Sequence, residues 1–160
     1  MSALIRGALR GAAAGASGTT ALNTLTYLDM VARARPASTT PEDTVEELSR
    51  RTGIDVPGAG KDRDNRVAGL GPLTGLAAGL GVGLVLGTAR ALGLRPRLVV
   101  SALVATVGAL VGTNGPMTAL GVTDPRTWAA TDWVADVVPH LAYGIVTAGV
   151  LQGLESHRPR

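Results

Sequence analysis

The chain has 160 residues, of which 46% are hydrophobic and only 2% aromatic, and it contains no cysteine. Disulfides, thiol nucleophiles and cysteine-ligated metals are therefore excluded. Charged residues make up 17%, against roughly 25% in typical soluble proteins, and the net charge of +3 comes without a basic stripe interleaved with aromatics, so no nucleic-acid partner is expected.

Four segments run almost free of charge over the length of a membrane-crossing helix. About 20 mostly apolar residues are needed to cross a bilayer core, whereas a soluble helix keeps one polar face toward water. The sequence therefore predicts an all-α, polytopic membrane protein, a four-transmembrane-helix bundle that forms a single membrane domain over residues 1–160 in contact with the lipid bilayer. The predicted spans cover residues 11–31, 67–90, 98–122 and 134–153.

The first predicted span is the least apolar of the four. It is rich in alanine, glycine and threonine, and it contains Asn23 and Asp29. Arg6 and Arg10 precede it, in the way that basic residues precede the apolar region of a secretory signal peptide. Because the segment lacks a leucine-rich region and a clear cleavage site, we interpret it as a crossing helix, with the signal peptide as the alternative.

Residues 32–66 form the only sizeable predicted extramembrane loop. Thr40 is a suitable N-cap and Pro41 suits the first helical position, so we expect a short amphipathic helix from Pro41 to about Arg51, with Val45, Leu48 and Ile54 toward one side. Such a helix would rest on the membrane surface or on the mouth of the bundle. We interpret the loop either as a solvated connector or as a lid or partner-binding segment.

Glycines recur at every fourth residue through the second predicted span. Consecutive members are one helical turn apart, so they form a groove without side chains, in which another helix backbone can approach closely in lipid. The pattern predicts tight helix packing, within one chain or between chains. These helix-packing residues are Gly71, Gly75, Gly79, Gly83 and Gly87.

Polar residues gather at one level of the predicted bundle. Because successive spans alternate in direction, the end of the first span, the end of the third and the start of the fourth lie in the same leaflet. Polar groups inside spans are costly and tend to mark function, so these residues are the candidate functional cluster. The cluster consists of Tyr27, Asp29, Asn114, Asp136 and His140.

Two interpretations of this cluster stay open. In one, Asp136 and His140 are one helical turn apart and form a proton-handling pair, since imidazole titrates near neutral pH. In the other, the residues are structural. Asp29 pairs with Arg33 at the interface, Asp136 caps the fourth span at headgroup level, and Asn23 and Asn114 form hydrogen bonds across helices.

Neither a metal site nor a hydrolytic site is expected. A site made of Asp132, Asp136 and His140 would offer a single nitrogen ligand, which is few for a metal. Ser17 and Ser101 lie in the predicted spans without a paired base, so no nucleophile of the serine-hydrolase type is indicated. The sequence predicts no cofactor and no enzymatic activity.

The distribution of basic residues predicts the orientation. Lysine and arginine in short flanking segments favour the cytoplasmic side. Arginines fall on one side at residues 6–10, 90–97 and 158–160, whereas the long loop on the other side balances seven basic residues with seven acidic ones. This density favours cytoplasmic termini and a location in the cell membrane, inner or plasma.

Three short stretches carry a family resemblance. They are Tyr27-Leu28-Asp29-Met30 at the end of the first span, Arg35-Pro36-Ala37-Ser38 after it, and His140-Leu141-Ala142-Tyr143-Gly144. With them the chain resembles small, uncharacterised four-span integral membrane proteins of GC-rich bacteria. The resemblance implies a multi-pass fold and no established activity.

The regular glycine spacing and the scarcity of reactive groups favour a non-enzymatic function. We expect a packing, accessory or partner-binding component that associates with a second copy of itself, as a homo-oligomer, or with another membrane protein. The alternative is a small transporter or proton-coupled permeation unit that uses the polar cluster. With four spans, such a unit would need to dimerise to enclose a pathway.

Overall fold

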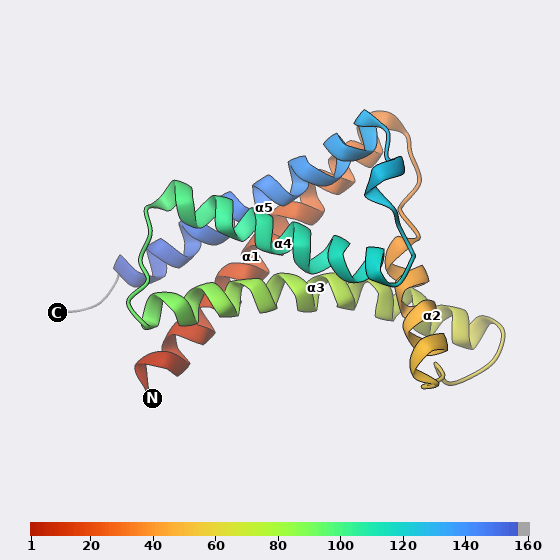
Figure 1. The fold of residues 1–160 in the computed structure, drawn as a ribbon, viewed down its shortest axis with the longest axis horizontal. Coiled ribbons are helices and arrows are strands. Elements are labelled where there is room, and N and C mark those ends of the chain that lie inside the picture. Colours follow the sequence, from red (N-terminus) through yellow and green to blue (C-terminus); the bar gives the residue numbers. More distant parts are fainter. Residues whose placement is uncertain (157–160) are drawn as a thin grey trace.

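The computed structural model describes residues 1–156, and over this range the regular structure is entirely helical, as the sequence predicts. In chain order the elements are α1 (Ala3–Arg33), α2 (Thr40–Thr52), α3 (Lys61–Ala91), α4 (Leu98–Ala119), the 3-10 turn η1 (Pro125–Thr127) and α5 (Ala130–Ser156). The start of α1, the end of α5 and the α3–α4 connection lie at the same end of the bundle (Figure 1).

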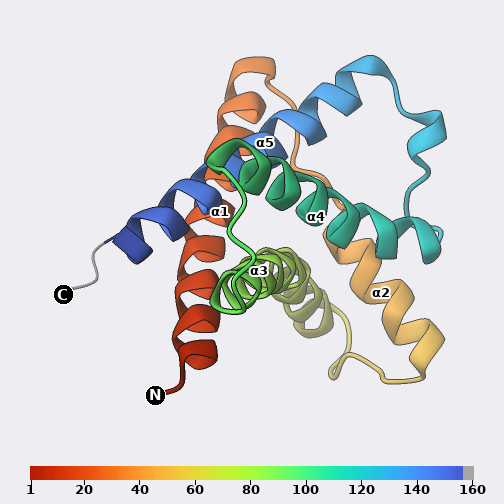
Figure 2. The ribbon, with the colours of Figure 1, turned by 60° about the vertical axis from the view of Figure 1, so that its left-hand side comes forward.

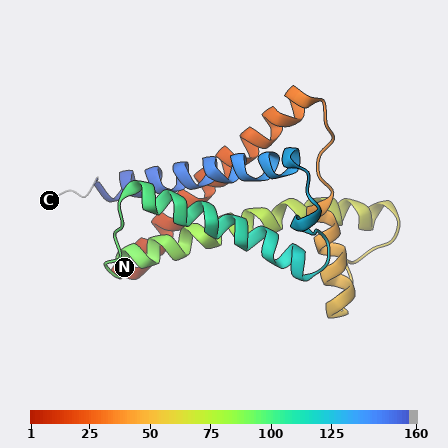
Figure 3. The same ribbon diagram turned by 45° about the horizontal axis from the view of Figure 1, so that its top comes forward.

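The four long helices form a ring. α1 packs against α3 on one side and against α5 on the other, α4 packs against α5, and a lighter contact between α3 and α4 closes the ring. Figure 2 looks nearly along α3 and shows α1 and α4 beside it. α2 packs on α3 at the end of the bundle opposite to the termini (Figure 3).

Small residues fill the interior of this ring. Ala14, Ala105 and Ala109 are buried together with several glycines, while Tyr143 and Leu151 are the largest fully buried side chains in the described chain. Leucines and valines lie outside instead, so that only 17% of the most apolar stretch of α3 and 22% of that of α4 is buried. A soluble bundle places these residues in its core, so the distribution is compatible with a membrane protein.

Three of the described helices, α3, α4 and α5, are long and apolar enough to cross a membrane, and not the four expected. α1 has sufficient length, with 31 residues. Glycine, alanine and threonine replace larger apolar residues along it, however, and Arg6, Arg10 and Asp29 lie within the helix. The expectation of four apolar spans is therefore wrong for residues 11–31, although a helix does form there.

The remaining helices follow the expected positions with small differences. The third predicted span, 98–122, ends early at Ala119, because Gly121 adopts a φ of 76° that turns the chain out of the helix. The helices around the second and fourth predicted spans extend beyond them at both ends. The charged residues that bound the apolar segments continue the helices, since they can reach the aqueous phase.

α2 is the short helix expected in the first loop. Its N-cap is Thr39 and not the expected Thr40, and Gly53, with a φ of 69°, ends it. On its apolar side, Val45 belongs to one buried cluster with Val67 of α3. The chain itself therefore covers Val45, whereas Leu48 and Ile54, expected on the same side, are exposed.

Candidate functional site

Glycines form the contact between α1 and α3. We call this contact the glycine seam, made of Gly7, Gly11 and Gly15 of α1 and Gly79, Gly83 and Gly87 of α3. The helices run antiparallel, so the first glycine of α1 lies against the last one of α3. A methyl group on any of the six would overlap an atom of the opposite helix. The seam therefore allows a backbone approach that no other residue type permits.

The other two glycines of the register have different surroundings. Gly71 is buried beneath the first turn of α2, where a methyl group would press on Pro41 and Glu42. Gly75 is exposed, and nothing lies within 4 Å of a methyl group built on it. Four of the five glycines predicted to pack helices, Gly71, Gly79, Gly83 and Gly87, therefore pack within the chain. The fifth, Gly75, is exposed.

Tyr143 connects all four long helices. Its hydroxyl donates a hydrogen bond to the carbonyl oxygen of Gly79 in α3 at 2.6 Å. Its side chain clusters with Ala105 and Ala109 of α4 and lies against Gly18 of α1, and the residue is only 1% exposed. Sequence analysis missed this role. The signal was present, since a tyrosine within an apolar helix needs an acceptor for its hydroxyl.

A polar network joins α4 and α5. We define the α4–α5 network as Thr113, Asn114, Asp136 and His140. The Asn114 amide donates to Asp136 Oδ2 at 2.8 Å, and His140 Nδ1 lies 2.8 Å from the Asp136 carbonyl oxygen and 3.4 Å from its Oδ1. His140 Nε2 lies 3.3 Å from the Thr113 hydroxyl. Both nitrogens of this buried imidazole, 7% exposed, are therefore held.

The other two members of the predicted cluster lie apart from this network. Asp29 forms ion pairs with Arg33 at 3.5 Å and Arg35 at 2.5 Å. Tyr27 is 61% exposed. Figure 3 shows the last turns of α1 separated from the start of α5. The cluster expected from the sequence therefore divides into the α4–α5 network and an ion-pair group at the end of α1.

The residues considered for a metal have other partners. Asp132 is exposed and accepts a hydrogen bond from the Ala129 backbone N–H at 3.0 Å, which caps the start of α5. Within residues 1–156, no three histidine or acidic side chains are grouped so that they could hold a metal ion. The Asp136 carboxylate accepts a hydrogen bond from the Asn114 amide, and His140 is bonded to the Asp136 backbone carbonyl.

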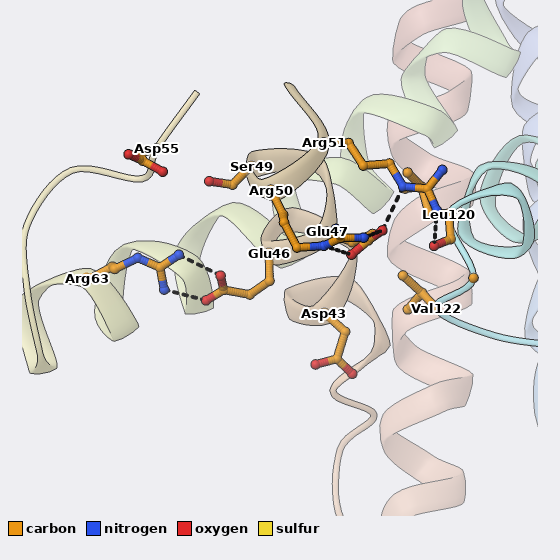
Figure 4. A pocket seen from close by; sticks show the side chains of 11 residues that line it. Asp43, Glu46, Glu47, Ser49, Arg50, Arg51, Asp55, Arg63, Leu120 and Val122 are labelled. Atoms are coloured by element: carbon orange, nitrogen blue, oxygen red, sulfur yellow. Dashed lines mark hydrogen bonds and ion pairs between the residues drawn. The ribbon is translucent and has the colours of Figure 1, made fainter. Parts of the chain in front are cut away.

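A charged pocket opens between α2 and the end of α4 (Figure 4). Its volume is about 750 Å³. Within it Glu46 pairs with Arg63 at 2.5 Å, and Glu47 pairs with Arg50 at 2.5 Å and Arg51 at 2.6 Å. These hydrogen bonds lower the pKa of Glu46 and lower that of Glu47 from 4.5 to about 2. The three arginines of the pocket are thus engaged by Glu46 and Glu47, while Asp43 and Asp55 line it without forming an ion pair with any of these arginines.

Arg51 also fastens α2 to α4. Its guanidinium donates to the carbonyl oxygens of Ala119 at 3.4 Å and Leu120 at 2.8 Å, as Figure 4 shows for Leu120. A cation at a helix C-terminus satisfies free carbonyls and the helix dipole. Because α2 also covers Gly71, it bridges α3 and α4 at the mouth of the bundle.

The outer face of α1 is unusually polar. We define it as the exposed residues Thr20, Asn23, Thr24 and Tyr27. Thr20 and Thr24 donate hydrogen bonds to carbonyl oxygens of their own helix, at 3.0 and 2.8 Å. The Asn23 amide has no hydrogen-bonding partner among the described residues, so the bond across helices expected for it is not formed within this part of the chain.

The described helices define an all-helical chain with three helices able to span a membrane. No family model, curated protein or solved structure matches the chain. The resemblance to small four-span bacterial proteins therefore stays a prediction based on three short stretches, and the function has to be argued from the geometry.

Proposed function

We propose that this chain is a four-span membrane protein with a non-enzymatic, associative function, and that it pairs with a second copy of itself through α1. One observation supports this most strongly: the outer face of α1 exposes an asparagine amide without a partner, beside hydroxyls and one tyrosine.

The seam favours α1 as the fourth crossing helix despite its low apolarity. Gly7 to Gly15 of α1 lie against Gly79 to Gly87 of α3, which is one of the three apolar helices. Further along, Gly18 packs on the middle of α5. A helix held between two crossing helices has to share their depth. Its small residues are then explained by close packing rather than by contact with lipid.

At this depth the outer face of α1 needs a cover. Thr20 and Asn23 lie beside Gly18, near the middle of the helix. Leaving an amide without hydrogen bonds in an apolar environment costs about 2 kcal/mol or more. Asparagines in membrane helices relieve that cost by bonding to a neighbouring helix. Since no described helix of the chain covers this face, a second polypeptide is the expected partner.

A second copy of the chain suits this face better than an unrelated apolar helix. An amide offers both donors and an acceptor, so two Asn23 side chains related by a twofold axis complement each other. The commonest oligomers are twofold dimers, in which the same surface is used on both subunits. The small residues beside Asn23 also allow the two backbones to come close.

Cysteine cross-linking in membranes tests the association directly, because the chain contains no native cysteine. With Thr24→Cys, which lies on the same exposed face and leaves Asn23 in place, we expect mild oxidation to give a dimer. The matched control is Val107→Cys, which is exposed on the outer side of α4, away from α1, and should stay monomeric. A monomer from both variants, together with a monomeric mass of the detergent-solubilised protein and no co-purified partner, would contradict the proposal.

We also propose that the termini are cytoplasmic and that the protein lies in the inner or plasma membrane. The support is the density of arginines where α1 begins and α3 meets α4, at Arg6, Arg10, Arg90, Arg95 and Arg97. These positions lie at the same end of the bundle (Figure 1). Short basic segments are retained on the cytoplasmic side.

A second candidate function is proton handling by the α4–α5 network. Thr113 donates to the Ala109 carbonyl at 2.9 Å, so its oxygen is free to accept from His140 Nε2, while Nδ1 donates to the Asp136 carbonyl. A ring with protons on both nitrogens therefore satisfies all these contacts, and the Asp136 carboxylate balances its charge. The contacts of the ring can therefore accommodate its protonated form, which a proton-handling site requires.

Flux measurements in liposomes test this candidate. Asp136→Asn should abolish pH-dependent flux, since it removes the charge facing His140 while preserving the hydrogen-bonding shape. Asp132→Asn, one turn nearer the helix start and exposed, is the matched control and should keep the flux. Equal flux in both variants and in the unmodified protein would eliminate proton handling by this network.

A further inference from the structure

A small cavity lies at the end of the bundle that carries the termini. Its volume is about 90 Å³. It is lined by Arg6 and Arg10 of α1, Ala91 at the end of α3, Arg95 of the α3–α4 connection and Glu155 of α5. We call it the basic cavity. It is distinct from the α4–α5 network and from the outer face of α1.

The single carboxylate that lines the basic cavity is already neutralised. Glu155 Oε2 accepts hydrogen bonds from Arg90 Nη2 at 2.8 Å and Nε at 3.0 Å. A third nitrogen of the same guanidinium donates to Ser101 of α4 at 3.2 Å. Arg90 therefore joins α3, α4 and α5, and Glu155 is engaged in holding the bundle together.

Three arginines around the cavity lack an acidic partner. Arg6 and Arg95 donate only to backbone carbonyl oxygens, those of Met1 and Arg90, and Arg10 is half-buried without a hydrogen bond to any described residue. No ion pair among the described residues involves any of the three. Three cations converge on this cavity, and the one carboxylate that lines it within residues 1–156 is occupied, so the cavity is suited to an anion.

We propose that the basic cavity binds the phosphate of an anionic phospholipid headgroup. Guanidinium groups match phosphate oxygens with paired hydrogen bonds. The cavity lies where α3 ends and α4 begins, which is the level of the headgroups if these helices cross the bilayer. Basic pockets between membrane helices are suited to anionic headgroups. The inference rests on membrane insertion, but it does not depend on pairing through α1.

Exposed apolar residues next to the arginines favour a lipid over a soluble phosphate. Ile5 and Leu9 adjoin Arg6 and Arg10 on α1, and Leu94 precedes Arg95, and all three apolar side chains are exposed. A lipid bound by its phosphate would place its acyl chains against such residues. Free phosphate gains nothing from them.

Titration of the full-length, detergent-solubilised protein with phosphatidylglycerol tests the proposal, with bound lipid measured by native mass spectrometry and phosphatidylcholine as the neutral comparison. The double variant Arg6→Gln, Arg10→Gln should weaken phosphatidylglycerol binding about 30-fold, since each basic side chain near an anionic surface contributes about 1 kcal/mol. Arg95→Gln, on a different element, should weaken it several-fold. Arg66→Gln is the matched control for Arg95→Gln. It removes one positive charge from an exposed site at the other end of α3 and should change binding less than twofold.

Unchanged phosphatidylglycerol binding in Arg95→Gln and in the double variant would overturn the proposal, as would equal binding of phosphatidylcholine. Competition with inorganic phosphate distinguishes the two sources of the anion. Weak displacement at millimolar phosphate supports the lipid. Strong binding of inorganic phosphate alone, sensitive to the same variants, would overturn the lipid assignment in favour of a soluble phosphate. The cross-linking of Thr24→Cys is unaffected by these outcomes, so failure here is separate from failure of the proposed association.

Discussion

Two neighbouring glycines of α3 show how strongly position decides what a residue does. A methyl group on Gly83 would overlap the carbonyl oxygen of Gly11, whereas one on Gly81 would meet nothing within 4 Å. Both residues are helical and both lie in an apolar stretch. Only the first is therefore required to be glycine by the packing of α1.

Substitution of these two glycines should have opposite effects on stability. Gly83→Ala should lower the unfolding free energy by about 1–3 kcal/mol, because the seam has to open to admit the methyl group. Gly81→Ala should raise it by up to about 1 kcal/mol, since alanine is the better helix former. Thermal unfolding in detergent measures both changes. Equal melting temperatures for the two variants would show that α1 and α3 do not pack through the seam.

The hydroxyl of Tyr143 allows a second comparison of like with like. Tyr143→Phe removes the hydrogen bond to Gly79 and should cost about 1 kcal/mol. Tyr27→Phe makes the same chemical change on an exposed side chain and should lower the melting temperature less than Tyr143→Phe does. If both variants unfold alike, Tyr143 does not link α5 to α3 through its hydroxyl.

Single residues also show where sequence reasoning stops. Because successive spans alternate in direction, the sequence indicates at which level of the bundle a residue lies. It does not indicate which neighbouring helix the residue faces. Asp136 and His140 are fixed by a one-turn spacing on one helix, so their contact could be predicted. Tyr27 and Asp29 share their level but lie on a helix end that separates from α5, and Arg35 engages Asp29 instead.

At the scale of elements, α2 is held by contacts at both of its ends. Its first turn covers Gly71 of α3, and Arg51 in its last turn binds the final carbonyls of α4. Glu47 orients Arg51 by an ion pair at 2.6 Å. The loop that contains α2 is thus a fastened segment across the mouth of the bundle.

The attachment of α2 should depend on pH through Glu47. Its pKa is lowered from 4.5 to about 2, so the carboxylate stabilises the folded form above about pH 4.5, and this contribution is lost as the pH falls toward 2. Glu47→Gln should speed amide hydrogen exchange in α2 at neutral pH, and its difference from the unmodified protein should vanish near pH 2. Glu46→Gln, whose partner is Arg63, keeps the pair between Glu47 and Arg51 and should therefore leave exchange at the end of α4 unchanged. If Glu46→Gln and Glu47→Gln change amide exchange to the same extent, this role for Glu47 is contradicted.

The positions of the helices could be predicted better than their environments. Charged residues bound the apolar segments of α3, α4 and α5, so a search for uncharged segments finds these helices. α2 follows from Pro41 and from the glycine at its end. The low apolarity of α1 was visible in the sequence, but its reason was not, because only the structure reveals that α3 and α5 cover its glycines.

At the scale of the whole molecule, the account depends on how many helices cross the membrane. Four crossings bring the start of α1 and the end of α5 to the same side, which is how the bundle is arranged (Figure 1). Three crossings, by α3, α4 and α5 alone, would leave α1 outside the bilayer or on its surface. The roles proposed here all require that α1 crosses the membrane. This holds for the glycine seam, for the outer face of α1 and for the basic cavity.

Locating both ends of the chain relative to the membrane tests this most directly. A tag at each end can be probed by protease in intact cells, in spheroplasts and in inverted vesicles, after carbonate washing has removed peripheral proteins. The account predicts that the chain stays in the membrane and that both tags are reached only from the cytoplasmic side. Tags on opposite sides, or a chain released by the wash, would contradict it.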